Sequence, residues 1–166
     1  MKSAGTPRPQ VRISAREGLA AYIALQAEYN LVQRKSYEQE PAPLVADAGL
    51  ACLPYAALAR GFLTGKYRLG GPEVDSPRAD QARAHLAGNG PAVLAALEEV
   101  AAAHHTTLAA VALAWLARQP TVATPLAGAR NPVQLTELLP FLTLRLGGDE
   151  IALLDQASAQ ASDVDR

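Results

Sequence analysis

Short apolar, strand-like runs alternate with longer helical segments along this chain of 166 residues. Residues 22–28, 50–54 and 121–127 are apolar and bounded by turn residues, which is typical of strands. Helical segments precede, separate and follow them, so the pattern is a βα repeat and predicts a parallel sheet in an α/β fold. About three parallel strands are too few for a closed barrel and thin for a doubly wound sheet. We therefore expect an incomplete α/β architecture.

The expected helices carry recognisable residues at their ends. Residues 12–17 end a helix, 36–48 form the next, and further helices begin at residues 91, 108 and 132, with a last one over about 149–158. The capping or terminating residues are Gly18, Ser36, Gly49, Thr107 and Asn131. Gln134, three residues after Asn131, gives a capping-box arrangement. Residues 69–89, rich in Gly, Pro, Arg and Asp, predict one long loop.

The composition excludes several classes of protein. Lys+Arg is 15 and Asp+Glu is 16, so the Lys/Arg excess that phosphate contacts require is absent and a nucleic-acid binder is disfavoured. A single cysteine, Cys52, excludes an internal disulfide framework and a cysteine-based zinc site, and we expect no metal site. No apolar run approaches the ~20 residues of a membrane span. We expect one cytoplasmic domain over residues 1–166, with a loose leader (1–11) and a frayed tail (159–166).

Two segments that follow expected strands combine residue types suited to a nucleotide. Residues 54–66 bring together Tyr55, Arg60 and Lys66 around a glycine-punctuated loop, which suits a flat ring and phosphates. Residues 125–134 combine Gly128 and Arg130 with a helix N-terminus, which is a natural anion site. Ligands of parallel α/β folds bind at the carboxyl ends of strands. The alternatives are a plain strand-to-loop turn with surface cations and a well-capped helix with a solvated arginine.

Four stretches of the sequence resemble the aldo-keto reductases, and most closely the bacterial branch similar to potassium-channel β subunits. These stretches are residues 25–31 (LQAEYNL), 55–67 (YAALARGFLTGKY), 112–116 (ALAWL) and 125–135 (PLAGARNPVQL), and the resemblance covers residues 12–157. It implies a partial (β/α)8 TIM barrel that binds NADPH at the carboxyl ends of its strands.

The resemblance also implies a role for each matching residue. Gln26 would contact the nicotinamide carboxamide and Tyr55 would stack on the nicotinamide ring. Leu58 and the loop that runs through Arg60 to Lys66 would hold the pyrophosphate. The adenosine 2′-phosphate would lie at Gly128 and Arg130, and the adenine end at Gln134 and Glu137.

Other positions depart from the family pattern. The family's catalytic Tyr, Lys, Asp and His belong to the amino-terminal half of the barrel, and no residue here matches them, so we expect no catalytic residue. Ala56 and Ala57 replace a usual Ser-Pro pair, and Leu138 replaces an Asn of the adenine pocket. His85, His104 and His105 are expected to be solvated or to lie at helix ends.

Three hypotheses of different classes follow. The chain is half of an NADPH-dependent reductase of small aldehydes or ketones and is inactive alone. It is completed by a separate amino-terminal half, as in a split enzyme, or it derives from a frameshifted or truncated gene. Alternatively, it is a non-catalytic NADP(H)-binding sensor. As a third possibility it is an interaction protein that self-associates through exposed barrel edges, because unpaired edge strands are prone to pair.

Overall fold

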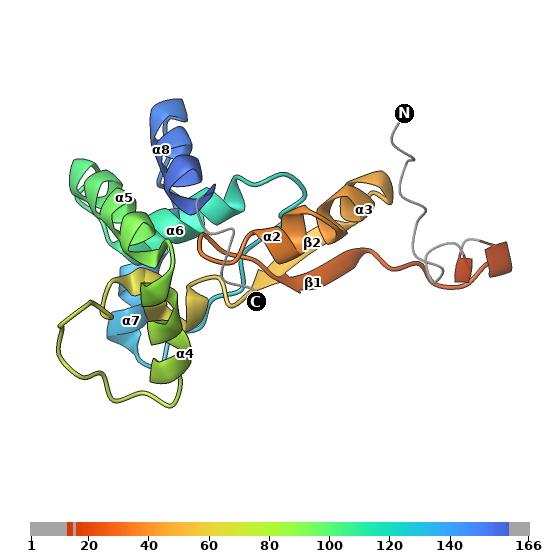
Figure 1. Ribbon diagram of the computed structural model, residues 1–166. Coiled ribbons are helices and arrows are strands. Elements are labelled where there is room, and N and C mark those ends of the chain that lie inside the picture. Colours follow the sequence, from red (N-terminus) through yellow and green to blue (C-terminus); the bar gives the residue numbers. More distant parts are fainter. Residues whose placement is uncertain (1–12, 15, 160–166) are drawn as a thin grey trace.

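Two parallel strands form the sheet of the computed structural model, which describes residues 13–14 and 16–159. Strand β1 (Ala24–Glu28) pairs with β2 (Ala51–Tyr55) in a register that runs from Ala24↔Ala51 to Glu28↔Tyr55. Helices α2 (Lys35–Glu38) and α3 (Pro41–Asp47) connect them (Figure 1). This βαβ unit confirms the α/β prediction. The expected leader (1–11) and the tail from residue 160 lie outside the described residues.

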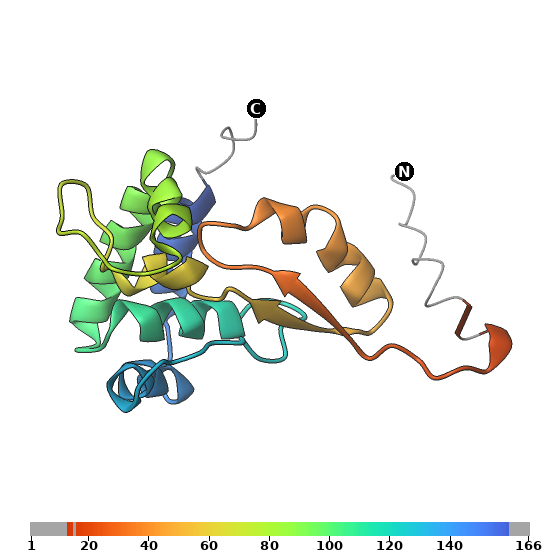
Figure 2. The ribbon, with the colours of Figure 1, turned by 90° about the horizontal axis from the view of Figure 1, so that it is seen from below.

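Helices α2 and α3 cover one face of the strands, as Figure 2 shows. Their side chains Tyr37 and Val45 are buried, and Cys52 of β2 is fully buried among them. The single helix expected over 36–48 is wrong, because Pro41 lacks an N–H group and starts a new helix at its first position. Ser36 lies inside α2 and is not its cap. Gly49 ends α3 as expected, with a left-handed φ of 62°.

The third expected strand, 121–127, is reduced to a single bridge beside β2. The bridge is parallel and joins Cys52 to Val122, and the amide of Leu126 donates to the carbonyl of Pro54 at 2.8 Å. Thr121 has a left-handed φ of 68°, and Pro125 has no N–H to donate, so a regular ladder cannot continue along the segment. The prediction of a third full strand is therefore wrong, although the chain follows the expected path.

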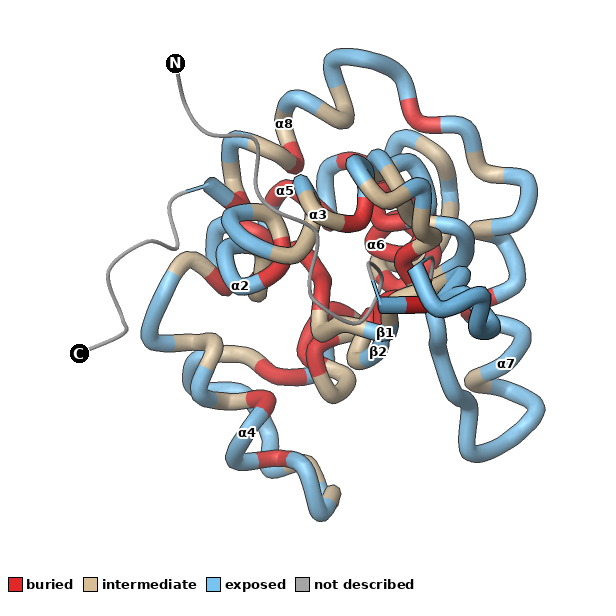
Figure 3. Tube along the Cα trace, turned by 90° about the vertical axis from the view of Figure 1, so that its right-hand side faces the viewer, coloured by how far each residue is buried: buried red, intermediate tan, exposed pale blue. Residues whose placement is uncertain are grey.

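A helical layer forms the core next to the sheet. Helix α5 (Gly90–Ala103) packs against α6 (Leu108–Ala117) and α8 (Gly148–Ala159). Every residue of α6 from Ala109 to Leu116 is buried, and Figure 3 shows this as a continuous red segment. Within the described part of the chain no single helix is long and apolar enough to cross a membrane. Helices α5 and α6 together have the length and apolar composition of a membrane span, but they are bent by 99° relative to each other.

Two helical segments lie outside that core. Helix α7 (Pro132–Leu138), continued by η3 (Leu139–Leu142), lies on the surface. The loop expected over 69–89 contains helix α4 (Ala79–Arg83) and the short η2 (Ala84–Ala87), so that prediction is wrong for residues 79–87. Ala79 and Ala82 are buried, and α4 packs on the 3-10 segment η1 (Ala59–Thr64) that follows β2. The buried face of α4 explains why an alanine-rich segment is helical in a region otherwise rich in turn residues.

Candidate functional site at the strand ends

The carboxyl ends of β1 and β2 present four neighbouring side chains on one face of the sheet. Residues Glu28 and Tyr55 are register partners, and Gln26 and Leu53 are the preceding pair on the same side. The opposite face carries Cys52 and faces α2 and α3. Gln26 is exposed and Tyr55 is 42% exposed, so the face that carries them is open at the strand ends. The structure therefore brings together two of the residues expected to contact the nicotinamide.

The loop after β2 turns tightly through left-handed residues. Ala56, Ala59 and Arg60 have φ values of 52°, 48° and 56°, and Gly61 and Gly65 have 92° and 81°. Such a conformation costs a non-glycine residue about 1–3 kcal/mol and persists only where the surroundings enforce it. Strained residues of this kind cluster at functional sites. The loop is thus a candidate binding element on backbone grounds alone.

Two residues at the end of β1 anchor this loop. The Asn30 side chain, 1% exposed, donates from Nδ2 to the carbonyl of Ala56 at 3.0 Å. The guanidinium of Arg60 donates to Oε1 of Glu28 at 2.7 Å. Sequence reasoning did not select Glu28 or Asn30 as site residues. The available signal was their position directly at the end of an apolar strand.

His85 lies beneath the same loop. Its ring packs against that of Phe62, with the centroids 5.4 Å apart and the ring planes inclined by 53°. Burial lowers the pKa of His85 below its usual value, and the charge of Arg60 lowers this pKa further, while Glu28 acts in the opposite direction. His85 is therefore neutral at pH 7, and it is half-buried against this loop and not a solvated surface residue as the sequence led us to expect.

The remaining expected residues of the first segment lie close to the turn. Leu58 is half-buried and packs against the core. Lys66 is exposed, with Nζ 5.2 Å from the centroid of the Tyr67 ring. A Cβ at Gly61 would lie 3.1 Å from Cε of Lys66, so the lysine chain folds back over the left-handed turn. The positive charge of Lys66 is thereby placed beside the loop.

The second expected segment begins beside the first. The hydrogen bond from Leu126 to Pro54 places the start of residues 126–131 next to the end of β2. Gly128, Arg130 and Glu137 are exposed and Gln134 is half-buried. A Cβ at Gly128 would meet nothing within 4 Å, so the chain itself does not require glycine there.

The start of α7 is capped, as the sequence predicts. Oδ1 of Asn131 accepts from the amide of Gln134 at 2.9 Å. The Gln134 side chain accepts from the amide of Arg130 at 2.9 Å and not from that of Asn131, so the capping box is shifted by one residue. These bonds involve only the backbone of Arg130. Its exposed side chain lies directly before the N-terminus of α7 and is free to contact an anion.

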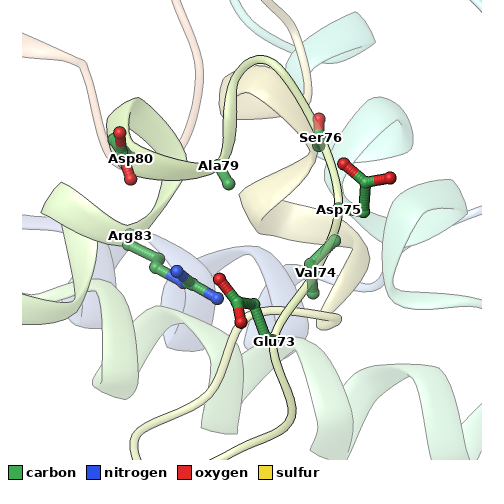
Figure 4. A pocket seen from close by; sticks show the side chains of 7 residues that line it. All are labelled: Glu73, Val74, Asp75, Ser76, Ala79, Asp80 and Arg83. Atoms are coloured by element: carbon green, nitrogen blue, oxygen red, sulfur yellow. The ribbon is translucent and has the colours of Figure 1, made fainter.

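A surface pocket of about 510 Å³ lies elsewhere. It is lined by Glu73, Val74, Asp75, Ser76, Ala79, Asp80 and Arg83. In Figure 4 the guanidinium of Arg83 points toward Glu73, and the other two carboxylates surround the hollow with no further cation among the labelled side chains. Three carboxylates against one guanidinium do not suit a phosphate-bearing ligand. Among the described residues, no group of three or more His, Cys, Asp or Glu side chains could hold a metal ion.

Comparison with known proteins identifies the family. The model of the aldo/keto reductase family matches residues 9–159. The chain belongs to the aldo/keto reductase family. This finding confirms the resemblance found in the motifs, and the family implies a (β/α)8 barrel with which the two-stranded parallel sheet and its helices are consistent.

Curated relatives of this aldo/keto reductase chain include channel subunits and reductases. It is 32% identical over 142 residues to a probable voltage-gated potassium channel β subunit of Oryza sativa, covering 79% of this chain and 43% of that protein. It is 31% identical over 145 residues to the L-glyceraldehyde 3-phosphate reductase of Escherichia coli O157:H7, covering 79% of this chain and 40% of that protein. The chain thus spans about two fifths of the length of these relatives.

Proposed function

We propose that this chain is the NADP(H)-binding, carboxyl-terminal part of an aldo/keto reductase. The observation that carries the proposal is the open face at the strand ends, where Gln26 and Tyr55 lie beside the left-handed loop 56–65. In parallel α/β folds this is where ligands bind. Turns with left-handed residues also present backbone N–H groups that suit phosphates.

The side chains fit a dinucleotide in two respects. The exposed Tyr55 ring offers a stacking surface and the Gln26 amide can both donate and accept hydrogen bonds, which matches a nicotinamide carboxamide. The exposed Arg130 guanidinium suits a phosphate monoester, which favours NADPH over NADH. Gly128, Gln134 and Glu137 would lie at the adenosine end, and Leu58 and Lys66 at the pyrophosphate.

The chemistry that the bound cofactor supplies is hydride transfer to a small carbonyl compound. This chain would bind and orient the dinucleotide, and no residue of the chain is assigned the role of proton donor. In this proposal the chain is not catalytic alone. The alternative that keeps the same site is a non-catalytic NADP(H) sensor.

A partner is part of the proposal because no described residue pairs with the outer edge of β1, and Gln26 on its open face is exposed. Leu19, Tyr22 and Ile23, just before β1, are 60%, 59% and 80% exposed. The fitting occupant is a polypeptide that supplies further parallel strands and helices of the same barrel, since the matched relatives are more than twice as long as their matched regions. Carbonyl reduction would require that completed barrel.

Titration of the purified chain with NADPH, followed by nicotinamide fluorescence, tests the proposal. We expect saturable binding that Tyr55→Ala weakens for both NADPH and NADH. Arg130→Ala should raise the Kd for NADPH by about tenfold or more and leave NADH unaffected, because a charged hydrogen bond contributes about 1.5–3 kcal/mol.

Arg118→Ala is the matched control. Arg118 is an exposed arginine that precedes residues 121–126, at the end of that segment opposite to Arg130, and its loss should leave both affinities unchanged. A folded chain that binds neither dinucleotide, or equal losses from Arg118→Ala and Arg130→Ala, would refute the site.

A further inference from the structure

The ion pair between Glu28 and Arg60 joins the end of β1 to the strained turn after β2. Nη1 of Arg60 and Oε1 of Glu28 are 2.7 Å apart, and the two side chains are 32% and 27% exposed. The carboxylate of Glu28 therefore neutralises Arg60. Arg60 is the one arginine in the loop that, by the family resemblance, would hold the pyrophosphate of the cofactor. An arginine held by a carboxylate is a weaker phosphate ligand, because the phosphate must displace that carboxylate or share the guanidinium with it.

We propose that Glu28 and Arg60 are positioning residues: their ion pair holds the turn at residues 59–61 against β1, and Arg60 does not bind the dinucleotide phosphates directly. The proposal rests on the proposed function in so far as the turn contributes to an NADP(H) site. It assigns the phosphates to backbone N–H groups of the loop and to the other cations, Lys66 and Arg130.

The backbone supports this assignment. Arg60 has φ 56° and ψ 26°, a conformation that an L-residue rarely adopts and that surrounding contacts must maintain. The ion pair supplies one such contact, and the bond from Asn30 to the carbonyl of Ala56 supplies a second from the same end of β1. Loop 56–60 is thus fixed at two points to a strand that carries Gln26.

Two further titratable side chains lie near the ion pair. They are His85, whose pKa the charge of Arg60 lowers, and Lys66, whose side chain folds back over Gly61. His85 is half-buried beneath the loop against Phe62 and is neutral, so it neither repels the guanidinium nor competes for Glu28. Because the pair is partly buried, water and salt screen it less than they screen an exposed pair.

Hydrogen exchange of the cofactor-free chain tests the positioning role directly. Glu28→Gln, Arg60→Gln and the double variant should each speed exchange of the amides in residues 56–65 by about tenfold, a factor that corresponds to 1.4 kcal/mol. The double variant should be no faster than the singles, because both remove the same interaction. Amides of α6 report whether each variant is folded, and Arg60→Lys, which keeps the charge, should show a smaller increase.

The matched control is Glu150→Gln. It removes a pair of similar exposure, 29% and 27%, between His104 and Glu150, which joins the end of α5 to α8. This variant should leave exchange in residues 56–65 unchanged. Unchanged exchange of that loop in Glu28→Gln and Arg60→Gln, with α6 protected, would overturn the proposal.

NADPH titration of the same variants separates positioning from direct binding. A positioning pair predicts that Glu28→Gln and Arg60→Gln weaken binding alike. A direct phosphate contact predicts instead that Arg60→Gln weakens binding while Glu28→Gln, which frees the guanidinium, strengthens it, and that result would overturn the proposal. If the unsubstituted chain binds no NADPH, the proposed function fails, and the exchange experiment still decides whether the pair positions the loop.

Discussion

Gly90 lies in close contact with the backbone of His85 and the ring of Phe62. It is the first residue of α5, and a Cβ there would lie 2.1 Å from the carbonyl oxygen of His85 and 2.6 Å from Cζ of Phe62. Gly→Ala in a helix ordinarily stabilises a protein by up to ~1 kcal/mol. Here we expect Gly90→Ala to lower the free energy of unfolding by about 1–3 kcal/mol, because a backbone oxygen must move. Urea denaturation measures this, with Gly148→Ala as control.

Gly148 begins α8, and a Cβ there would meet nothing within 4 Å, so its replacement by alanine should be neutral or stabilising. Equal effects of the two substitutions would contradict the close approach.

Contacts of this kind show what the sequence could not predict at the scale of single residues. Gln26 and Tyr55 lie at strand ends that local pattern predicts. The roles of Glu28 and His85 depend on where the loop after β2 returns in space, which no local pattern contains.

At the scale of elements, Thr107 joins two helices. Its hydroxyl accepts from the amide of Ala110 at 3.1 Å, which caps α6, and donates to the carbonyl of Glu137 in α7 at 2.7 Å. Thr107→Val keeps the shape and removes both bonds, so we expect it to lower the unfolding free energy by about 1–2 kcal/mol. The neighbouring Thr106 hydroxyl is buried with no partner among the described residues, so Thr106→Val should cost little or stabilise. Thermal and urea unfolding of both variants checks this; a larger loss from Thr106→Val would contradict it.

The predictability of the elements follows from how local their causes are. β1, β2, α5 and α6 are predicted closely because apolar periodicity and caps such as Thr107 lie within each segment. The division between α2 and α3 also has a local cause, because Pro41 cannot donate a helical hydrogen bond, although the sequence led us to expect a single helix there. The failure of residues 121–127 to form a full strand depends on the left-handed Thr121 and on Pro125. Helix α4 depends on burial against η1, which is a tertiary contact that periodicity does not report.

For the whole molecule, the decisive feature is a sheet with one covered side and one open side. Helices α2 and α3 cover the side of Cys52, whereas Gln26 and Tyr55 remain exposed on the other. Membership of the family implies a barrel, and the structure has two strands and a bridge of it. Motifs in the sequence sufficed to identify the family, because each motif is short and contiguous.

The edge that precedes and includes β1 should govern association of the isolated chain. Glu28, at the end of β1, is paired with Arg60, and residues 18–27 contain neither a charged side chain nor a proline, while Tyr22 and Ile23 are exposed. Most of the edge therefore lacks the residues that prevent strands from pairing with other strands. We expect reversible, concentration-dependent self-association in sedimentation velocity. Ile23→Lys should shift the chain toward monomer without loss of helical circular dichroism. Leu142→Lys, which replaces a leucine that is 60% exposed on η3, should not. A monomeric unsubstituted chain, or equal effects of the two lysines, would show that the edge does not drive association. If Ile23→Lys alone acts, adding a peptide that pairs with the outer edge of β1 should compete with self-association, because both would occupy the same row of backbone donors and acceptors.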